Sequence, residues 1–151
     1  MRIDKFSGKY RFLSNFYHSQ ILYNGFTYRS VEAAFQAAKS LDPAYWEKFC
    51  DFDPQRAKSE GRKLPLRKDW EEVKDNVMLY LLRRKFSDSI LAQLLVDTGD
   101  AELIEGNTWN DTYWGVCNGI GQNKLGKFLI QVREVINKNR KNYEKLKQIL
   151  K

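Results

Sequence analysis

The chain is poor in the residues that build metal sites and nucleophilic triads. Its 151 residues include one histidine, His18, and two cysteines, Cys50 and Cys117. A lone histidine cannot supply a polyhistidine metal site, and nothing near it resembles a Ser-His-Asp arrangement. The two thiols have no metal-ligand spacing and are typical of a reducing compartment. We therefore expect a cytoplasmic protein that uses neither a metal nor an organic cofactor.

Long apolar runs and nucleotide-binding loops are also missing. No apolar stretch approaches the roughly 20 residues of a membrane span, and Met1–Lys5 lacks the pattern of a signal peptide. No P-loop motif occurs, and Gly119-Ile-Gly-Gln-Asn123 lacks the preceding strand of a dinucleotide fingerprint. Repeats, low-complexity tracts and linkers are absent as well. The sequence predicts no membrane association and a single domain over residues 1–151.

Positive charge is unevenly distributed along the chain. The net charge is +7, but the segment 137–151 alone carries +5, and we expect it to be a basic helical extension of the domain. A solvated helix face is the usual explanation for such a segment. A second basic concentration near the middle of the chain suits a phosphate group; it comprises Arg56, Lys58, Arg62, Lys63, Arg67 and Lys68. Neither patch identifies a partner, and the sequence specifies no protein partner.

Local signals predict a mainly helical α+β fold with six or seven helices around one core. Asn24-Gly25 between two apolar segments predicts a β-hairpin, because this pair tolerates the two positive φ angles of a type I′ turn. Helix starts are predicted at Ser30, Asp42-Pro43, Asp53-Pro54, the Asp69/Glu72 capping box, Ser87 or Asp88, and about Leu125. The hairpin and the segment near residue 103 are expected to form a small antiparallel sheet.

Two polar clusters, far apart in the sequence, point to a ligand pocket. Glu32, Gln36 and Lys39 are spaced at i, i+4 and i+7, so a helix would align them along one stripe. In Asn110–Gly115, turn chemistry places Asp111 beside the indole of Trp114. The alternatives are a helix-dipole partner, a solvated lysine and a surface turn entering the core. Acid–base or amine chemistry from Glu32, Lys39, Glu105 and Asp111 remains as the catalytic option.

Motifs spread over about 120 residues resemble the YbiA-like family, also called the NADAR domain. The matching segments are Leu13-Ser-Asn-Phe16, Ser30-Val-Glu32 with Gln36 and Lys39, Ala57-Lys58 with Gly61, Asp69-Trp70, Met78, Lys85-Phe86, Leu103-Ile-Glu105, Asn110-Asp-x-Tyr-Trp-Gly115, and Gly121-x-Asn-x-Leu-Gly126 with Val132-Arg133. This chain departs from the pattern at Ala33, where many relatives have histidine, and in the short segment after Gly115. These departures bear on substrate preference.

The resemblance implies a YbiA-like α+β fold and N-glycosidase activity on a phosphorylated ribosyl compound. Two substrates are implied: a ribosylamino-pyrimidine phosphate of early riboflavin synthesis, and ADP-ribosylated guanine, free or in nucleic acid. Cleavage builds positive charge on the ribose, which a fixed carboxylate stabilises. Glu32 or Asp111 would take that role, and the other would orient or deprotonate water. Alternatively, Lys39 would capture the opened sugar as a Schiff base.

The remaining site residues are predicted as substrate contacts. Trp114 would stack on the base or the sugar ring, and Asn15 would contact a sugar hydroxyl, unless it only shapes a turn. Further substrate contacts are expected from Gln36, Arg56, Lys58, Arg62 and Tyr113, with the basic residues facing phosphate. A function of another class uses the same pocket: a non-catalytic module that binds ADP-ribose or nucleic acid.

Overall fold

Helices make up most of the computed structural model, which describes residues 1–151. The six α-helices are α1 (Val31–Ala37), α2 (Pro43–Phe49), α3 (Pro54–Gly61), α4 (Trp70–Lys85), α5 (Ser89–Val96) and α6 (Lys124–Leu150). A 3-10 helix, η1 (Gly8–Leu13), lies near the N-terminus. The mainly helical α+β class is therefore confirmed.

Helix α1 lies at the centre of this arrangement. It starts at Ser30, whose hydroxyl accepts the backbone N–H of Ala33 at 3.1 Å, as the sequence predicted. Every residue of α1 is buried, and the helix contacts α2, α3, α4 and the hairpin. Small alanine side chains permit this close packing on several sides. Consequently, Glu32 and Gln36 are polar residues held within the core.

The starts of α2 and α3 follow the predicted acid–proline pattern. Asp42 Oδ1 accepts the N–H of Ala44 at 3.0 Å, and Asp53 Oδ1 accepts that of Arg56 at 2.8 Å. The start of α4 differs, because Asp69 makes no side-chain cap hydrogen bond. Both oxygens of Asp69 instead accept from the guanidinium of Arg67, at 2.6 and 2.9 Å. The capping-box prediction was wrong because the charged donor engages this carboxylate.

The strands form three separate two-stranded sheets. The predicted hairpin is present as β2 (Ile21–Tyr23) paired antiparallel with β3 (Phe26–Tyr28), and its turn residues Asn24 and Gly25 have φ of 52° and 82°. The other pairs are parallel: β1 (Arg2–Ile3) with β4 (Glu102–Leu103), and β5 (Gly106–Asn107) with β6 (Val116–Cys117). The expectation that the segment near residue 103 joins the hairpin was therefore wrong.

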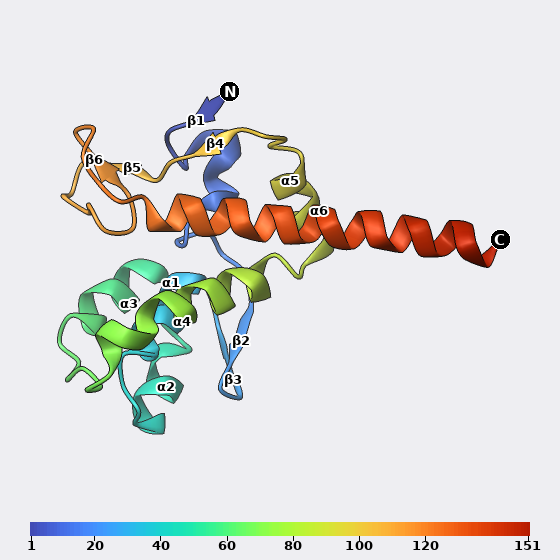
Figure 1. Cartoon of the computed structure of the whole chain (residues 1–151). Coiled ribbons are helices and arrows are strands. Elements are labelled where there is room, and N and C mark those ends of the chain that lie inside the picture. Colours follow the sequence, from blue (N-terminus) through green and yellow to red (C-terminus); the bar gives the residue numbers. More distant parts are fainter.

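Helix α6 crosses the whole molecule and extends beyond it (Figure 1). Its first half packs on α4, α5 and β4 and buries Leu125, Leu129 and Val132. Figure 1 shows α1 to α4 and the hairpin on one side of α6, and β1, β4 and α5 on the other. From Lys138 onward every residue is exposed. No helix has the length and apolarity needed to cross a membrane.

Candidate active site

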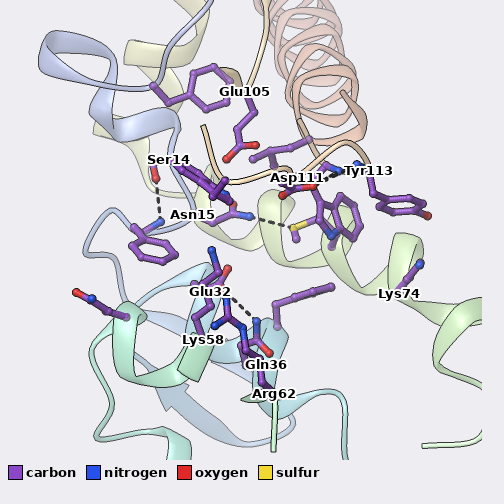
Figure 2. Close-up of a pocket in the computed structure, with 18 of the residues that line it drawn as sticks. Ser14, Asn15, Glu32, Gln36, Lys58, Arg62, Lys74, Glu105, Asp111 and Tyr113 are labelled. Atoms are coloured by element: carbon purple, nitrogen blue, oxygen red, sulfur yellow. Dashed lines mark hydrogen bonds between the residues drawn. The ribbon is translucent and has the colours of Figure 1, made fainter. Parts of the chain in front are cut away.

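A cavity of about 880 Å³ opens between two structurally different walls. We call α1 and α3 the helical wall, and residues 105–114 the loop wall. Figure 2 shows the side chains of Glu32, Gln36 and Lys58 on the helical wall facing Glu105 and Asp111 on the loop wall. The rest of the lining comes from Phe6, residues 14–16, Lys39, α4 and Leu125 of α6. The fold thus joins the two polar clusters that are about 70 residues apart in sequence.

The carboxylate of Glu32 is buried but supported by a neighbour on its own helix. Gln36 Nε2 donates to Glu32 Oε1 at 2.8 Å, one turn along α1. Gly61 of α3 permits this, because a Cβ there would lie 2.0 Å from Gln36 Oε1. Burial raises the pKa of Glu32, whereas the Gln36 hydrogen bond and the charge of Lys58 oppose that rise. Glu32 therefore has partners that favour its ionised form.

Glu105 faces the same cavity with much less support. Its Oε2 is buried without a hydrogen-bond partner and lies against Gly115, where a Cβ would come within 2.1 Å. Burial, together with the negative charges of Asp111 and Glu32, raises the pKa of Glu105 to about 8. A carboxyl with this pKa is largely protonated at neutral pH.

Asp111 is fixed by the turn that the sequence indicated. Its Oδ1 accepts the backbone N–H groups of Tyr113 at 3.2 Å and Trp114 at 2.9 Å. The side chain of Asn107 holds the same turn, since its amide donates to Asp111 O and its oxygen accepts Asp111 N–H. Asn110 takes the left-handed conformation, with φ of 64°. These contacts direct the Asp111 carboxylate at the cavity (Figure 2).

Lys39 lines the cavity from the turn that follows α1. The helix ends at Ala37, so the predicted stripe continues through a tightened turn in which Lys39 N–H donates to Gln36 O at 3.2 Å. Burial lowers the pKa of Lys39; the charge of Glu32 opposes this effect and that of Arg62 adds to it. A lowered pKa enlarges the fraction of neutral, nucleophilic amine.

Lys58 sits among the acidic groups at the cavity mouth. Its Nζ lies 5.8 Å from the ring centroid of Phe16 and 5.3 Å from that of Trp109. Its charge acts on the pKa of both Glu32 and Glu105. The two rings are 36% and 57% exposed, which leaves them accessible to a ligand. Lys58 therefore combines a charge for the carboxylates with a cation–π position at the entrance.

The other predicted basic contacts separate in the structure. Arg62 lines the cavity next to Lys39. Arg56 does not line it: its guanidinium lies 4.4 Å from the ring centroid of Phe52, and the residue is exposed. The spacing on α3 explains the difference, because Lys58 and Arg62 are one turn apart on the cavity side whereas Arg56 is not. The structure therefore does not bring Arg56 to the site.

Tyr113 and Trp114 also line the cavity, and both are held firmly. The Tyr113 hydroxyl donates to Asp75, which also accepts from Lys124 at 2.6 Å. The Trp114 ring meets Phe35 edge-on, with centroids 5.4 Å apart at 88°, and Tyr113 at 4.8 Å and 85°. These contacts fix the orientation of the indole at the cavity wall.

Asn15 lines the cavity from the segment after η1. Its Nδ2 lies 3.5 Å from Met78 Sδ, and its Oδ1 is buried without a partner. The buried ammonium of Lys85 donates to Ser14 O at 2.8 Å and thereby anchors this segment. Burial lowers the pKa of Lys85 to about 7.

A family model described as the NADAR domain matches residues 4–137 of this chain. The chain belongs to the NADAR domain family. It is 43% identical to N-glycosidase YbiA of Shigella flexneri, over 85% of this chain and 82% of that relative. An NMR structure of the E. coli protein YbiA superposes with a TM-score of 0.81 at 38% identity, covering 93% of this chain and 86% of that one.

The similarity to N-glycosidase YbiA over most of this chain supports N-glycosidase activity. A further relative is a riboflavin biosynthesis protein of Vibrio vulnificus, 35% identical over 82% of this chain, which spans 35% of that protein. The family resemblance recognised from the motifs is thereby confirmed, and the chain is an enzyme of the N-glycosidase type. The relatives' names leave its substrate undecided.

Several lining residues were missed by sequence reasoning. Phe16 and Trp109 stood among other aromatic residues, and Lys74 among other charged residues of α4, with no spacing that linked them to the site. Glu105 was considered only as one of four acid–base candidates. The signal that could have raised it is its place between the buried Leu103 and the Asn110 turn, inside a motif of the family.

Proposed function

We propose that the chain hydrolyses the bond between the anomeric carbon and nitrogen of a phosphorylated ribosyl compound. The observation that carries the proposal is the meeting of Glu32 and Asp111 in one cavity with Lys39 and Arg62. The carboxylates suit positive charge developing on the ribose, and the cations suit phosphate. The cavity volume is within the usual range for small-molecule sites.

In this proposal Glu32 stabilises the charged ribose and Asp111 orients the attacking water. Gln36 fixes one oxygen of Glu32, and the turn amides fix one oxygen of Asp111, so each carboxylate has a defined direction. Such preorganisation is the main source of electrostatic transition-state stabilisation. Asn15 and Trp114 are assigned to the sugar and to the base or ring, respectively.

The preferred substrate is a ribosylamino-pyrimidine phosphate, supported by the riboflavin biosynthesis relatives. A second candidate is ADP-ribosylated guanine. It is favoured by the exposed Phe16 and Trp109 rings, which offer an additional stacking surface at the cavity mouth. Both substrates present the same C–N bond and at least one phosphate.

The test is incubation of the purified protein with each compound, followed by separation of the products. Release of free aminopyrimidine and ribose 5-phosphate supports the first substrate, and release of unmodified guanine nucleotide supports the second. Saturable binding without turnover of either compound would refute the enzyme and leave a binding module.

The role of Lys39 needs its own experiment, because its lowered pKa also permits imine chemistry. Borohydride added during turnover would trap a covalent ribose adduct if the amine attacks the opened sugar. Peptide mapping then distinguishes Lys39 from Lys58. Direct water attack predicts no adduct and only a mild effect of Lys39→Arg, because the positive charge is kept. The imine route predicts an adduct and no turnover in this variant, since a guanidinium cannot add to the carbon.

A further inference from the structure

The two oxygens of Glu105 have unequal surroundings. Oε2 is buried against Gly115 without any donor, so Oε1 is the oxygen open to the cavity. The backbone on both sides is fixed: Glu105 N–H donates to Asn123 Oδ1 at 3.0 Å, and Val116 N–H donates to Glu105 O at 2.9 Å. Figure 2 shows the carboxyl directed into the space between the two walls.

An ionised Glu105 would leave negative charge on the buried Oε2, which accepts no hydrogen bond. Burying an unpaired charge is costly, and the group avoids this by keeping its proton. The carboxylates facing it are Glu32 from α1 and Asp111 from the same loop; the opposing positive charge comes from Lys58 of α3. Further cations line the cavity: Lys39, Arg62 and Lys74.

The other two carboxylates accept well-defined hydrogen bonds, whereas the Asn107 side chain beside Glu105 only partly opposes the rise of its pKa and leaves Oε2 unpaired. Glu32 accepts from Gln36, and Asp111 accepts two backbone N–H groups. When the surroundings of neighbouring carboxyl groups push their pKa values apart, the group with the higher pKa serves as the acid. The others serve as bases or stabilise charge. Of the three, Glu105 is the one with a buried carboxyl oxygen that accepts no hydrogen bond, and its pKa is raised to about 8.

We propose that Glu105 is the general acid of the reaction, delivering the proton of its cavity-facing oxygen to the nitrogen that leaves the ribose. This inference rests on the proposed function. The C1′–N bond breaks, its electron pair goes to nitrogen, and the Glu105 proton joins that nitrogen. Water oxygen bonds to C1′ and loses a proton to Asp111. Transfer of that proton through solvent restores Glu105, so the net change is addition of one water.

The experiment measures kcat of wild type and Glu105→Gln on the ribosylamino-pyrimidine phosphate from pH 6 to 9.5. Glu102→Gln is the matched control, because Glu102 is exposed and lies three residues earlier, outside the cavity. Circular dichroism and substrate binding establish that each variant is folded. We expect wild-type kcat to fall above about pH 8, where Glu105 loses its proton. Glu105→Gln should lower kcat by about 10²–10⁴-fold and abolish that alkaline decline.

A second substrate separates proton donation from mere positioning. A 4-nitrophenyl ribofuranoside 5-phosphate has a leaving group that needs no proton, so Glu105→Gln should retain most of the wild-type rate on it. Equal losses on both substrates, or a variant with full kcat, would overturn the assignment. If the variant does not fold, a wild-type kcat that stays flat to pH 9.5 overturns it. Failure of the proposed function is a distinct result, because wild type then turns over neither compound.

Discussion

The helical wall and the loop wall hold their acidic groups in opposite ways. On α1, Glu32 has a hydrogen-bond donor one turn away and two lysines that oppose its loss of charge. On the loop wall, Glu105 has a buried oxygen that accepts no hydrogen bond, and the negative charges of Asp111 and Glu32 disfavour its ionisation. Burial acts on both groups in the same direction. The two walls therefore differ in the hydrogen bonds and charges that oppose the rise in carboxyl pKa caused by burial.

This difference follows from how each wall is built. A helix brings residues i and i+4 together, so Gln36 is placed against Glu32 by backbone geometry alone. The loop wall has only two-residue strands, and its shape depends on asparagine side chains and on close approaches at glycines. The neighbours of a side chain on such a loop are set by tertiary contacts. For Glu105 the neighbour is Gly115, which supplies no hydrogen-bond donor to Oε2.

Among the further substitutions, loss of charge on the helical wall should have the largest effect. Glu32→Gln keeps the shape but removes the charge that stabilises the developing cation, so we expect turnover to fall by about 10²–10³-fold. Substrate binding should be retained. Steady-state kinetics and calorimetric binding measure the two effects, and Glu47→Gln on α2 is the control, since Glu47 is exposed. Full activity of both Glu32→Gln and Asp111→Asn would refute the site assignment.

Two glycine substitutions compare the walls directly. In Gly115→Ala, the new Cβ would lie 2.1 Å from both the backbone oxygen and Oε2 of Glu105. Because backbone must move, we expect the unfolding free energy to fall by about 1–3 kcal/mol. We expect activity to be lost as well.

In Gly61→Ala the new Cβ would lie 2.0 Å from Oε1 and 2.7 Å from Cδ of Gln36, which can swing away, and 3.0 Å from its Cβ, which must shift slightly. Stability should fall less than in Gly115→Ala, because the new Cβ clashes with no backbone atom and alanine favours the helix, while activity falls about tenfold as Glu32 loses its hydrogen bond. Thermal melts measure the change in stability of both variants, and kcat measures the change in their activity. Equal destabilisation by the two substitutions would show that the walls do not differ in rigidity as described.

The buried Lys85 that anchors Ser14 should make stability depend on pH. The pKa of Lys85 is about 7 when folded, against 10.5 for the ordinary side chain. Between these values the unfolded chain binds more protons, so stability should rise with pH, by up to about 1.4 kcal/mol per pH unit. Lys85→Met lacks this contribution. Urea unfolding of both proteins from pH 7 to 10 is the measurement. If the unfolding free energy of the two proteins changed with pH in the same way, the lowered pKa of Lys85 would be contradicted.

Removal of the projecting half of α6 should have the smallest effect on catalysis. Residues from Lys138 onward are exposed, and one side-chain hydrogen bond, Arg140 to Gln93 at 2.9 Å, joins them to the rest of the molecule. A chain ending at Ile136 should keep its turnover per folded molecule and lose salt-dependent attraction to nucleic acid. Active-site titration combined with kinetics tests this, and a folded truncated protein without turnover would show that the site depends on the part of α6 that follows Ile136.

The sequence predicted the helical wall better than the loop wall. Helix starts at Ser30, Asp42 and Asp53 depend on caps within three residues, so local patterns suffice. The pairing of Leu103 with Ile3 joins segments 100 residues apart, and no local pattern contains it. Asp111 was found because its turn is local.

The environment of Glu105 and the mouth formed by Phe16 and Trp109 exist only after these distant segments meet. The position of Arg56 outside the cavity lining is likewise decided by distant contacts. Basic composition indicated a phosphate contact, whereas the packing of Arg56 on Phe52 is decided by the fold.

Product analysis with the ribosylamino-pyrimidine phosphate tests the central claim most directly. Wild type should release aminopyrimidine and ribose 5-phosphate in equal amounts over many turnovers, while Glu32→Gln binds the compound and releases products at least 100-fold more slowly. Saturable binding of this compound and of ADP-ribosylated guanine by wild type, with no product from either, would contradict the claim that the cavity is a catalytic site.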